Sequence, residues 1–254
     1  MARGNGARPA RRAATKELPP PLPPGERTVG QLVAETIRAY GARFWRALPL
    51  GLPLAVADQL SVHHTVGAQV LVFWIVGPLF VAGFLWACRL LHDAPITRTA
   101  VLVGALVYVP FPVLRAVYIL PGLAWFALLG LAVPAAMVEG LGFRDALIRG
   151  RRLGVADFAH ALGSLAALVV VVGVADNVLS SLLHTQGDNG QRVAVFLSDL
   201  VLGPLLFLGG AMLYDDQAAR IGSRRRRAKE PRDADLHPPV DADAAGGSDP
   251  QVES

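Results

Sequence analysis

The chain has few charged residues. Lys, Arg, Asp and Glu make up 17% of its 254 residues, against about 25% in soluble domains. The deficit falls in the middle, because the first 45 or so and the last 40 or so residues are polar. A middle this apolar has too little polar surface to stay in solution. The composition therefore excludes an ordinary soluble domain and predicts a membrane protein.

Cysteine and catalytic motifs are almost absent too. The single cysteine, Cys88, excludes an intramolecular disulfide, and no CxxC or other zinc spacing occurs. No GxSxG, Walker A, HExxH or GxGxxG motif stands in a credible context. We therefore expect no catalytic residue, no metal and no cofactor. The first apolar run also starts too late for a cleavable signal peptide, so the first span is expected to insert the chain.

Long apolar segments are what the chain does have. A helix needs about 20 residues to cross the bilayer core. Six segments approach or exceed this length, at about 44–60, 66–91, 99–117, 120–138, 158–183 and 193–214. The first is marginal, since it contains Pro49, Pro53 and Asp58. The sequence predicts an all-α integral membrane bundle of six transmembrane helices, with kinks at the internal prolines.

The distribution of positive charge predicts the topology. With six spans, 22 of the 24 Lys and Arg residues fall on one side, and only Arg115 and Arg192 fall on the other. Cytoplasmic flanks collect Lys and Arg. We therefore expect a multi-pass protein of the bacterial inner (plasma) membrane with both termini in the cytoplasm. Omitting the weak first span would move the N-terminal basic cluster outside.

Amphipathic helices are predicted before spans one and five. Thr28 and Gln31 fit a capping box that opens the first, and Leu32, Thr36 and Tyr40 share its apolar face. Phe143–Leu153 has a similar apolar face opposite a basic one. Such helices lie in the membrane interface. Residues 42–60 and 156–179 also read loosely alike, which leaves a parallel duplication or chance similarity open.

The two ends of the chain are predicted to be disordered cytoplasmic tails, at 1–26 and 222–254, around a membrane domain at 27–221. The first tail is basic and proline-rich. The run after span six could bind nucleic acid or anionic lipid, and we interpret it as a topology anchor on lipid headgroups, with no nucleic-acid partner. The predicted cytoplasmic interface anchors are Arg144, Arg149, Arg151, Arg152, Arg224, Arg225, Arg226 and Arg227.

Three segments carry a resemblance to a known family. They are TVGQLVAETIRAYGARFWRAL, PAAMVEGLGFRDALIRGRRL and LGPLLFLGGAMLYDDQAAR. Over about residues 27–221 the chain resembles the glycerophosphoryl diester phosphodiesterase membrane-domain group, most members of which have no assigned activity. The resemblance implies a multi-helix membrane domain that some proteins join to a soluble phosphodiesterase. Neither tail is long or apolar enough for a TIM-barrel catalytic domain, so phosphodiesterase activity is not expected here.

Ionisable residues inside the spans are the candidate functional residues, because burying charge in lipid is costly. The candidate intramembrane polar cluster comprises Asp58, Arg115, Asp176, Asn177 and Asp199, all predicted in the outer half of the membrane. Aspartates that pair with Arg115 would hold the bundle together, bind a cation or relay protons. The pair Asp176-Asn177 lies deepest and is the first choice.

Other polar residues favour structural roles. Glu139 is expected to form a salt bridge with the arginine-rich helix that follows it, and Asp215 and Asp216 are expected to neutralise the same arginines. His63, His64 and His184 occupy predicted outer loops without a regular spacing, so a metal site is not expected.

Three functions follow as hypotheses. The first is a non-enzymatic membrane protein that assembles with or modulates another membrane component. The second is a small transporter or channel that uses the outer-half Asp/Arg cluster. The third is a lipid-active membrane enzyme, which has least support. The expected partners are the anionic bilayer and a membrane protein, and the sequence leaves the oligomeric state open.

Overall fold

The computed structural model describes residues 23–183 and 187–236, in which every regular element is helical. The elements are α1 (Val29–Ala42), α2 (Phe44–Ala47), the 3-10 helix η1 (Leu48–Gly51), α3 (Leu52–Ser61), α4 (Val66–His92), α5 (Arg98–Tyr108), α6 (Phe111–Val117), α7 (Ile119–Leu129), α8 (Ala132–Val138), α9 (Phe143–Ala156), α10 (Phe158–Leu183) and α11 (Gly187–Leu236).

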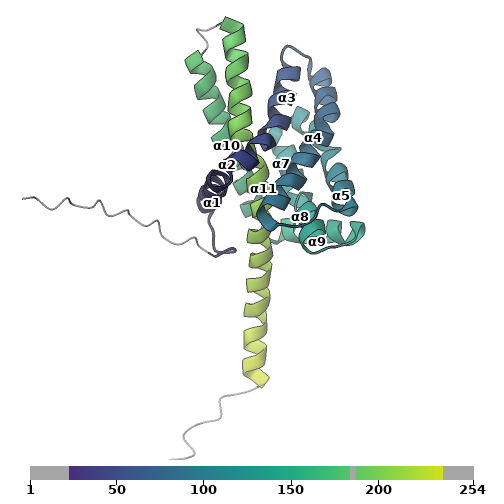
Figure 1. The fold of residues 1–254 in the computed structure, drawn as a ribbon. Helices are drawn as coiled ribbons and strands as arrows, with labels where there is room; N and C mark the ends of the chain where they lie inside the picture. The colour runs from purple at the N-terminus through teal and green to yellow at the C-terminus, as the bar shows by residue number, and fades with distance from the viewer. Residues whose placement is uncertain (1–22, 184–186, 237–254) are drawn as a thin grey trace, which may run out of the picture.

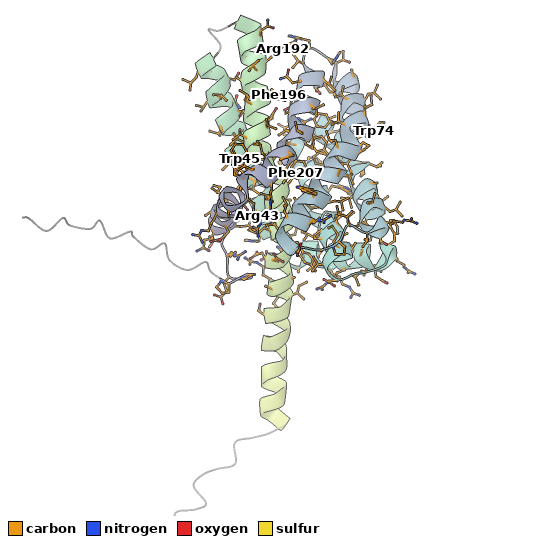
Figure 2. All side chains as sticks on the ribbon, viewed as in Figure 1. Arg43, Trp45, Trp74, Arg192, Phe196 and Phe207 are labelled. Carbon is orange, nitrogen blue, oxygen red and sulfur yellow. The ribbon has the colours of Figure 1, made fainter. Side chains whose placement is uncertain are left out.

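Five helical segments in the described part of the chain are long and apolar enough to cross a membrane. They are Val66–His92, Arg98–Val117, Ile119–Val138, Phe158–Leu182 and Asn189–Arg224. Large apolar side chains cover much of the outside of the bundle, among them Trp45 and Trp74, which are 80% and 48% exposed; Figure 2 shows Trp74 at the edge of the bundle. Such a surface suits lipid contact. The chain is therefore a multi-pass membrane protein.

The segment predicted as span one does not form a single helix. Residues 44–60 are divided among α2, η1 and α3, and they are not among the five long apolar segments. Pro49 and Pro53 each stand in the first turn of a new helical piece, because proline has no N–H for the preceding turn. Five of the six predicted spans therefore correspond to long apolar helical segments, and the first, which was marginal in the sequence, does not.

Proline also divides the predicted spans three and four. α5 ends at Tyr108, and α6 starts after Pro110. The break between α7 and α8 precedes Pro134, which cannot donate a backbone hydrogen bond to the preceding turn. By contrast, the predicted spans two and five are continuous as α4 and α10.

α11 is the central helix of the bundle (Figure 1). It packs against α1, η1, α3, α4 and α10. It also continues below the bundle to Leu236, so α11 includes residues 222–236 of the segment predicted as a tail. At the other end of the chain, residues 23–28 precede α1, and Gly25 donates a hydrogen bond to Asp216 at 2.9 Å. Residues 1–22 and 237–254 of the predicted tails lie outside the described residues.

The two amphipathic segments are helical. Thr28 caps α1 through the predicted capping box, and its buried residues Leu32, Thr36 and Tyr40 face α10 and α11, the helices against which α1 packs. α9 packs against α7 and α8 at two glycines. A Cβ atom on Gly150 would lie 2.4 Å from the Ala132 nitrogen, and one on Gly154 would lie 2.4 Å from the Ala127 oxygen. Close contact between these helices therefore requires glycine.

Candidate functional site

Four of the five predicted intramembrane residues come together from four different helices. Arg115 of α6 lies 3.9 Å from Asp58 of α3, measured from Nη2 to Oδ1. On the neighbouring helices, Ser198 of α11 donates a hydrogen bond to Asp176 of α10. Asp199 follows Ser198 and interacts electrostatically with Asp58, Asp176 and Arg115. We call Asp58, Arg115, Asp176, Ser198 and Asp199 the polar layer.

Arg115 is the positive charge of the polar layer. Its guanidinium carbon lies 4.0 Å from the centre of the Phe73 ring, which is cation–π range. The side chains of Arg115 and Asp58 are 34% and 33% exposed. At 3.9 Å and with this exposure, their ion pair is weak.

Asp199 is the most buried member of the polar layer. It is 1% exposed, and its Oδ2 atom has no hydrogen-bond partner among the residues that the structure describes. η1 packs directly on the backbone of α11 here: a Cβ on Gly51 would lie 2.2 Å from the Leu200 carbonyl oxygen and 2.6 Å from the Asp199 carbonyl oxygen. An unpartnered buried carboxylate oxygen is costly, so Asp199 is the strongest candidate for a ligand-binding group.

Asn177 does not join the polar layer. Its side-chain amide donates to the Gly173 carbonyl of its own helix at 2.7 Å, and the residue is exposed. Its place in the candidate cluster is therefore corrected. Ser198, which the sequence reasoning passed over, takes the position beside Asp176 instead. Its seryl hydroxyl gave no signal in an apolar span, because serine is common at helix contacts in membranes.

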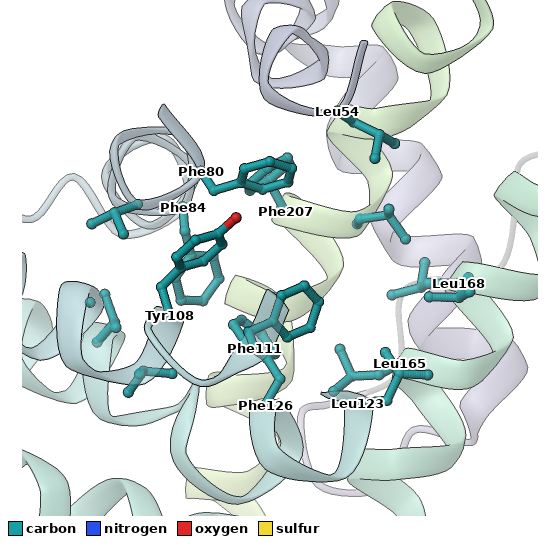
Figure 3. Close-up of a pocket in the computed structure, with 16 residues that line it drawn as sticks. Leu54, Phe80, Phe84, Tyr108, Phe111, Leu123, Phe126, Leu165, Leu168 and Phe207 are labelled. Atoms are coloured by element: carbon teal, nitrogen blue, oxygen red, sulfur yellow. The ribbon is translucent and has the colours of Figure 1, made fainter. Parts of the chain in front are cut away.

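An apolar cavity, partly open to the outside, lies among α3, α4, α5, α6, α7, α8, α10 and α11 (Figure 3). Its volume is about 150 Å³. Of the sixteen lining residues, only Tyr108 carries a polar side-chain atom, and its hydroxyl donates to the Phe73 carbonyl at 2.8 Å. We call this cavity the apolar chamber. Its aromatic lining residues are Phe80, Phe84, Tyr108, Phe111, Phe126 and Phe207.

A second group of charges lies at the opposite end of the bundle. Asp216 is 0% exposed, and its Oδ2 accepts from Arg220 Nε at 2.9 Å and lies 2.8 Å from His160 Nε2. Arg220 also donates to Asp157 Oδ2 at 2.9 Å and to the Arg27 carbonyl at 2.6 Å. This network joins the starts of α1 and α10 to α11. We call it the Asp216 network.

The Asp216 network corrects the prediction that Asp215 and Asp216 neutralise the arginines of α9. The sequence analysis did not predict its other contacts. Asp216 pairs with Arg220 and His160 and not with the arginines of α9, while Asp215 lies 3.6 Å from His92. The Asp216–Arg220 spacing of four residues on a helix was the available signal. Asp157 and His160 had no such signal, because about sixty residues separate them from their partners.

The arginines of α9 have different surroundings. Arg149 Nε donates to Glu139 at 2.8 Å, which confirms the predicted salt bridge, and the Tyr214 hydroxyl donates to the same carboxylate at 2.7 Å. Arg144, Arg151 and Arg152 are exposed. Arg224 donates to the Ala156 carbonyl at 2.6 Å. The side chains of Arg225, Arg226 and Arg227 lie outside the described residues, so nothing here tests their role as anchors.

The predicted outer histidines do not define a site. His63 and His64 lie in the α3–α4 connection, and His184 lies outside the described residues. Within the described ranges, no group of three His, Cys, Asp or Glu residues is arranged to hold a metal ion. Comparisons with family models, with curated proteins and with solved structures gave no match. The resemblance to the phosphodiesterase membrane-domain group therefore stays a prediction, and the function is argued from the polar layer and the apolar chamber.

Proposed function

We propose that the chain is a small membrane transporter that binds a cation at the polar layer. The observation that carries the proposal is that Asp58, Asp176 and Asp199 lie near one another with Arg115 beside Asp58, while Asp199 Oδ2 is buried and unpartnered in the described structure. Three carboxylates around one guanidinium attract positive charge. Ionisable groups placed within spans mark substrate and ion pathways in membrane proteins.

The proposal includes a membrane placement. The chain lies in a bacterial inner membrane with both termini in the cytoplasm, α1 and α9 at the cytoplasmic interface, and α2–η1–α3 as a broken sixth crossing. Support comes from the positive-inside distribution and from the exposed arginines of α9. The transported cation passes without covalent chemistry, so the protein is not an enzyme.

Charge movement in reconstituted membranes tests the proposal. Proteoliposomes of the full chain are adsorbed on a solid-supported membrane and exposed to jumps in proton, sodium and methylammonium concentration. We expect a transient current with at least one of these cations. The current is expected to disappear in Asp199→Asn and Asp176→Asn, because each substitution removes a negative charge from the polar layer.

The matched control for these substitutions is Asp215→Asn, which alters an aspartate of the same helix outside the polar layer. We expect its current to equal that of the wild type. Absence of current with all three cations, and also with a larger organic ammonium ion such as 4-phenylbutylammonium, would refute transport. A current that persists in Asp199→Asn would show that the polar layer is not the binding site.

A second candidate function is assembly with another membrane component, which the long extension of α11 favours. The helix continues to Leu236 and stands clear of the bundle (Figure 1). A chain truncated after Ser223 tests this function in native gels of gently solubilised host membranes. We expect a complex larger than the monomer for the full chain only. Monomeric migration of both chains would contradict the assembly.

A further inference from the structure

The polar layer and the apolar chamber lie on the same faces of the same helices. Asp58 and Arg115 each follow a chamber-lining residue, Leu54 and Phe111, by four positions. Residues four apart lie on one face of a helix, about 6 Å apart along its axis. α3 and α6 therefore each present an apolar lining residue and, one turn further on, a charged one.

The other two helices repeat this arrangement with a longer interval. Asp176 follows the lining residue Val169 by seven positions, and Asp199 precedes the lining residue Leu206 by seven. Seven residues are about two turns, or roughly 10 Å, so each pair again shares a face. Because α10 and α11 are antiparallel, both aspartates lie on the side of the chamber nearer the α10–α11 connection. The polar layer thus lies at one end of the apolar chamber.

The apolar chamber has the size and lining to hold one aromatic ring. An apolar cavity of about 150 Å³ is large enough to bind benzene and stays free of water, and the chamber has a volume of about 150 Å³. Figure 3 shows Phe80, Phe84 and Tyr108 on one side of it and Leu165 and Leu168 on the other. Aromatic rings favour edge and offset contacts with such a lining.

The polar layer in turn lacks a hydrogen-bond donor at Asp199, and its three carboxylates beside one guanidinium favour a donor with positive charge. Asp199 Oδ2 is buried without a partner in the described part of the chain. A protonated primary amine supplies three N–H donors and a positive charge, whereas a quaternary ammonium supplies the charge alone. The geometry therefore distinguishes between these two kinds of cation.

We propose that the ligand of this site is an arylalkyl primary ammonium ion, whose ring occupies the apolar chamber and whose ammonium group binds Asp199. This inference rests on the proposed function and names its substrate class. The linker must span one to two helical turns, about 6 to 10 Å. 4-Phenylbutylamine, with one ring and a four-carbon linker, meets the lower end of this range and is the probe.

Binding is measured with radiolabelled 4-phenylbutylamine on the full chain in lipid nanodiscs, and empty nanodiscs correct for partition into lipid. We expect saturable binding. Unlabelled 4-phenylbutylamine should displace the label at least tenfold better than either 4-phenylbutyltrimethylammonium, which lacks N–H donors, or butylamine, which lacks the ring. The anion 4-phenylbutyrate should not displace it.

Three variants test whether the amine binds at both the polar layer and the apolar chamber. Asp199→Asn is expected to weaken binding at least tenfold, because the charge is lost while the size of the side chain is kept. Val169→Phe fills the chamber and is expected to weaken binding at least tenfold. Val170→Phe makes the same change at the adjacent residue, which is 60% exposed and does not line the chamber, and should bind as the wild type does.

The inference is overturned if binding does not exceed that of empty nanodiscs, or if Asp199→Asn and Val169→Phe bind as tightly as the wild type. Asp199-dependent currents of protons or sodium, without binding of the amine, would overturn this inference and leave the proposed transport standing. If the wild-type protein gives neither currents nor amine binding, both the proposed transport function and the proposed ligand are refuted.

Discussion

Asp215 and Asp216 are neighbours on α11 with opposite surroundings. Asp216 is fully buried and binds Arg220, His160 and the Gly25 amide, whereas the side chain of Asp215 is 43% exposed and lies 3.6 Å from His92. Burying a carboxylate is tolerated only where charge and hydrogen bonds compensate for lost water. The Asp216 network is therefore expected to hold the starts of α1 and α10 on α11.

Replacement of these two aspartates separates their contributions. Asp216→Ala is expected to destabilise the protein by about 3 kcal/mol, because it leaves the Arg220 guanidinium without its buried partner. Asp215→Ala is expected to cost less than about 1 kcal/mol, as exposed ion pairs do. The measurement is the temperature at which half of the detergent-solubilised protein loses its monodisperse form. Equal losses in the two variants would contradict the role given to Asp216.

Among the helices, α9 shows how a sequence pattern can be correct and still incomplete. Its amphipathicity predicted a helix, and the structure has one at Phe143–Ala156. The pattern did not show that Gly150 and Gly154 lie directly against the backbones of α8 and α7. In the sequence, a glycine inside a helix only lowers the helix propensity. Its packing role is not visible there, because the backbone that it contacts belongs to a distant segment of the chain.

Gly150→Ala tests this packing against a glycine without contacts. Alanine in a helix interior is normally more stable than glycine by about 0.5–1 kcal/mol. Gly173 has no neighbour within 4 Å of an added Cβ atom, so Gly173→Ala should be neutral or stabilising. Gly150→Ala is expected to destabilise by about 1–3 kcal/mol, because α9 must move away from Ala132. The same thermal measurement compares them, and equal stability would show that the α8–α9 contact adjusts freely.

For the whole molecule, the sequence predicted the continuous apolar helices. It did not predict where helices break or which side chains from different helices meet in a cavity. The predicted boundaries of α10 agree with the structure at both ends, and those of α4 agree within one residue. Pro49 and Pro53 were seen in the sequence, yet tertiary packing against α11 decides how the chain divides around them. The polar layer was found because charges stand out in apolar spans. The apolar chamber was not found, because Phe80 or Phe207 in a cavity wall has the same sequence signature as phenylalanine in a filled core.

The broken segment before α4 is the feature that decides the topology of the whole chain. The chain before α4, which contains this segment, is tied to α11 at two points, by the Gly25–Asp216 bond and by the bond from Gln59 to the Arg192 carbonyl, each 2.9 Å long. Between Arg192 and Asp216, α11 rises by roughly 36 Å at 1.5 Å per residue. This exceeds the bilayer core of about 30 Å. Residues 25–59 therefore extend along α11 far enough to cross the membrane.

Cysteine labelling in a Cys88→Ser background tests this crossing. Glu26→Cys, His64→Cys and Arg144→Cys place single thiols at exposed positions, and intact cells are treated with a membrane-impermeant maleimide. If residues 25–59 cross, His64→Cys is labelled in intact cells, whereas Glu26→Cys and the cytoplasmic control Arg144→Cys are labelled only after lysis. If the segment folds back without crossing, Glu26→Cys is labelled from outside together with His64→Cys. That result would place the N-terminal arginines outside, against the positive-inside distribution, and would leave five crossings.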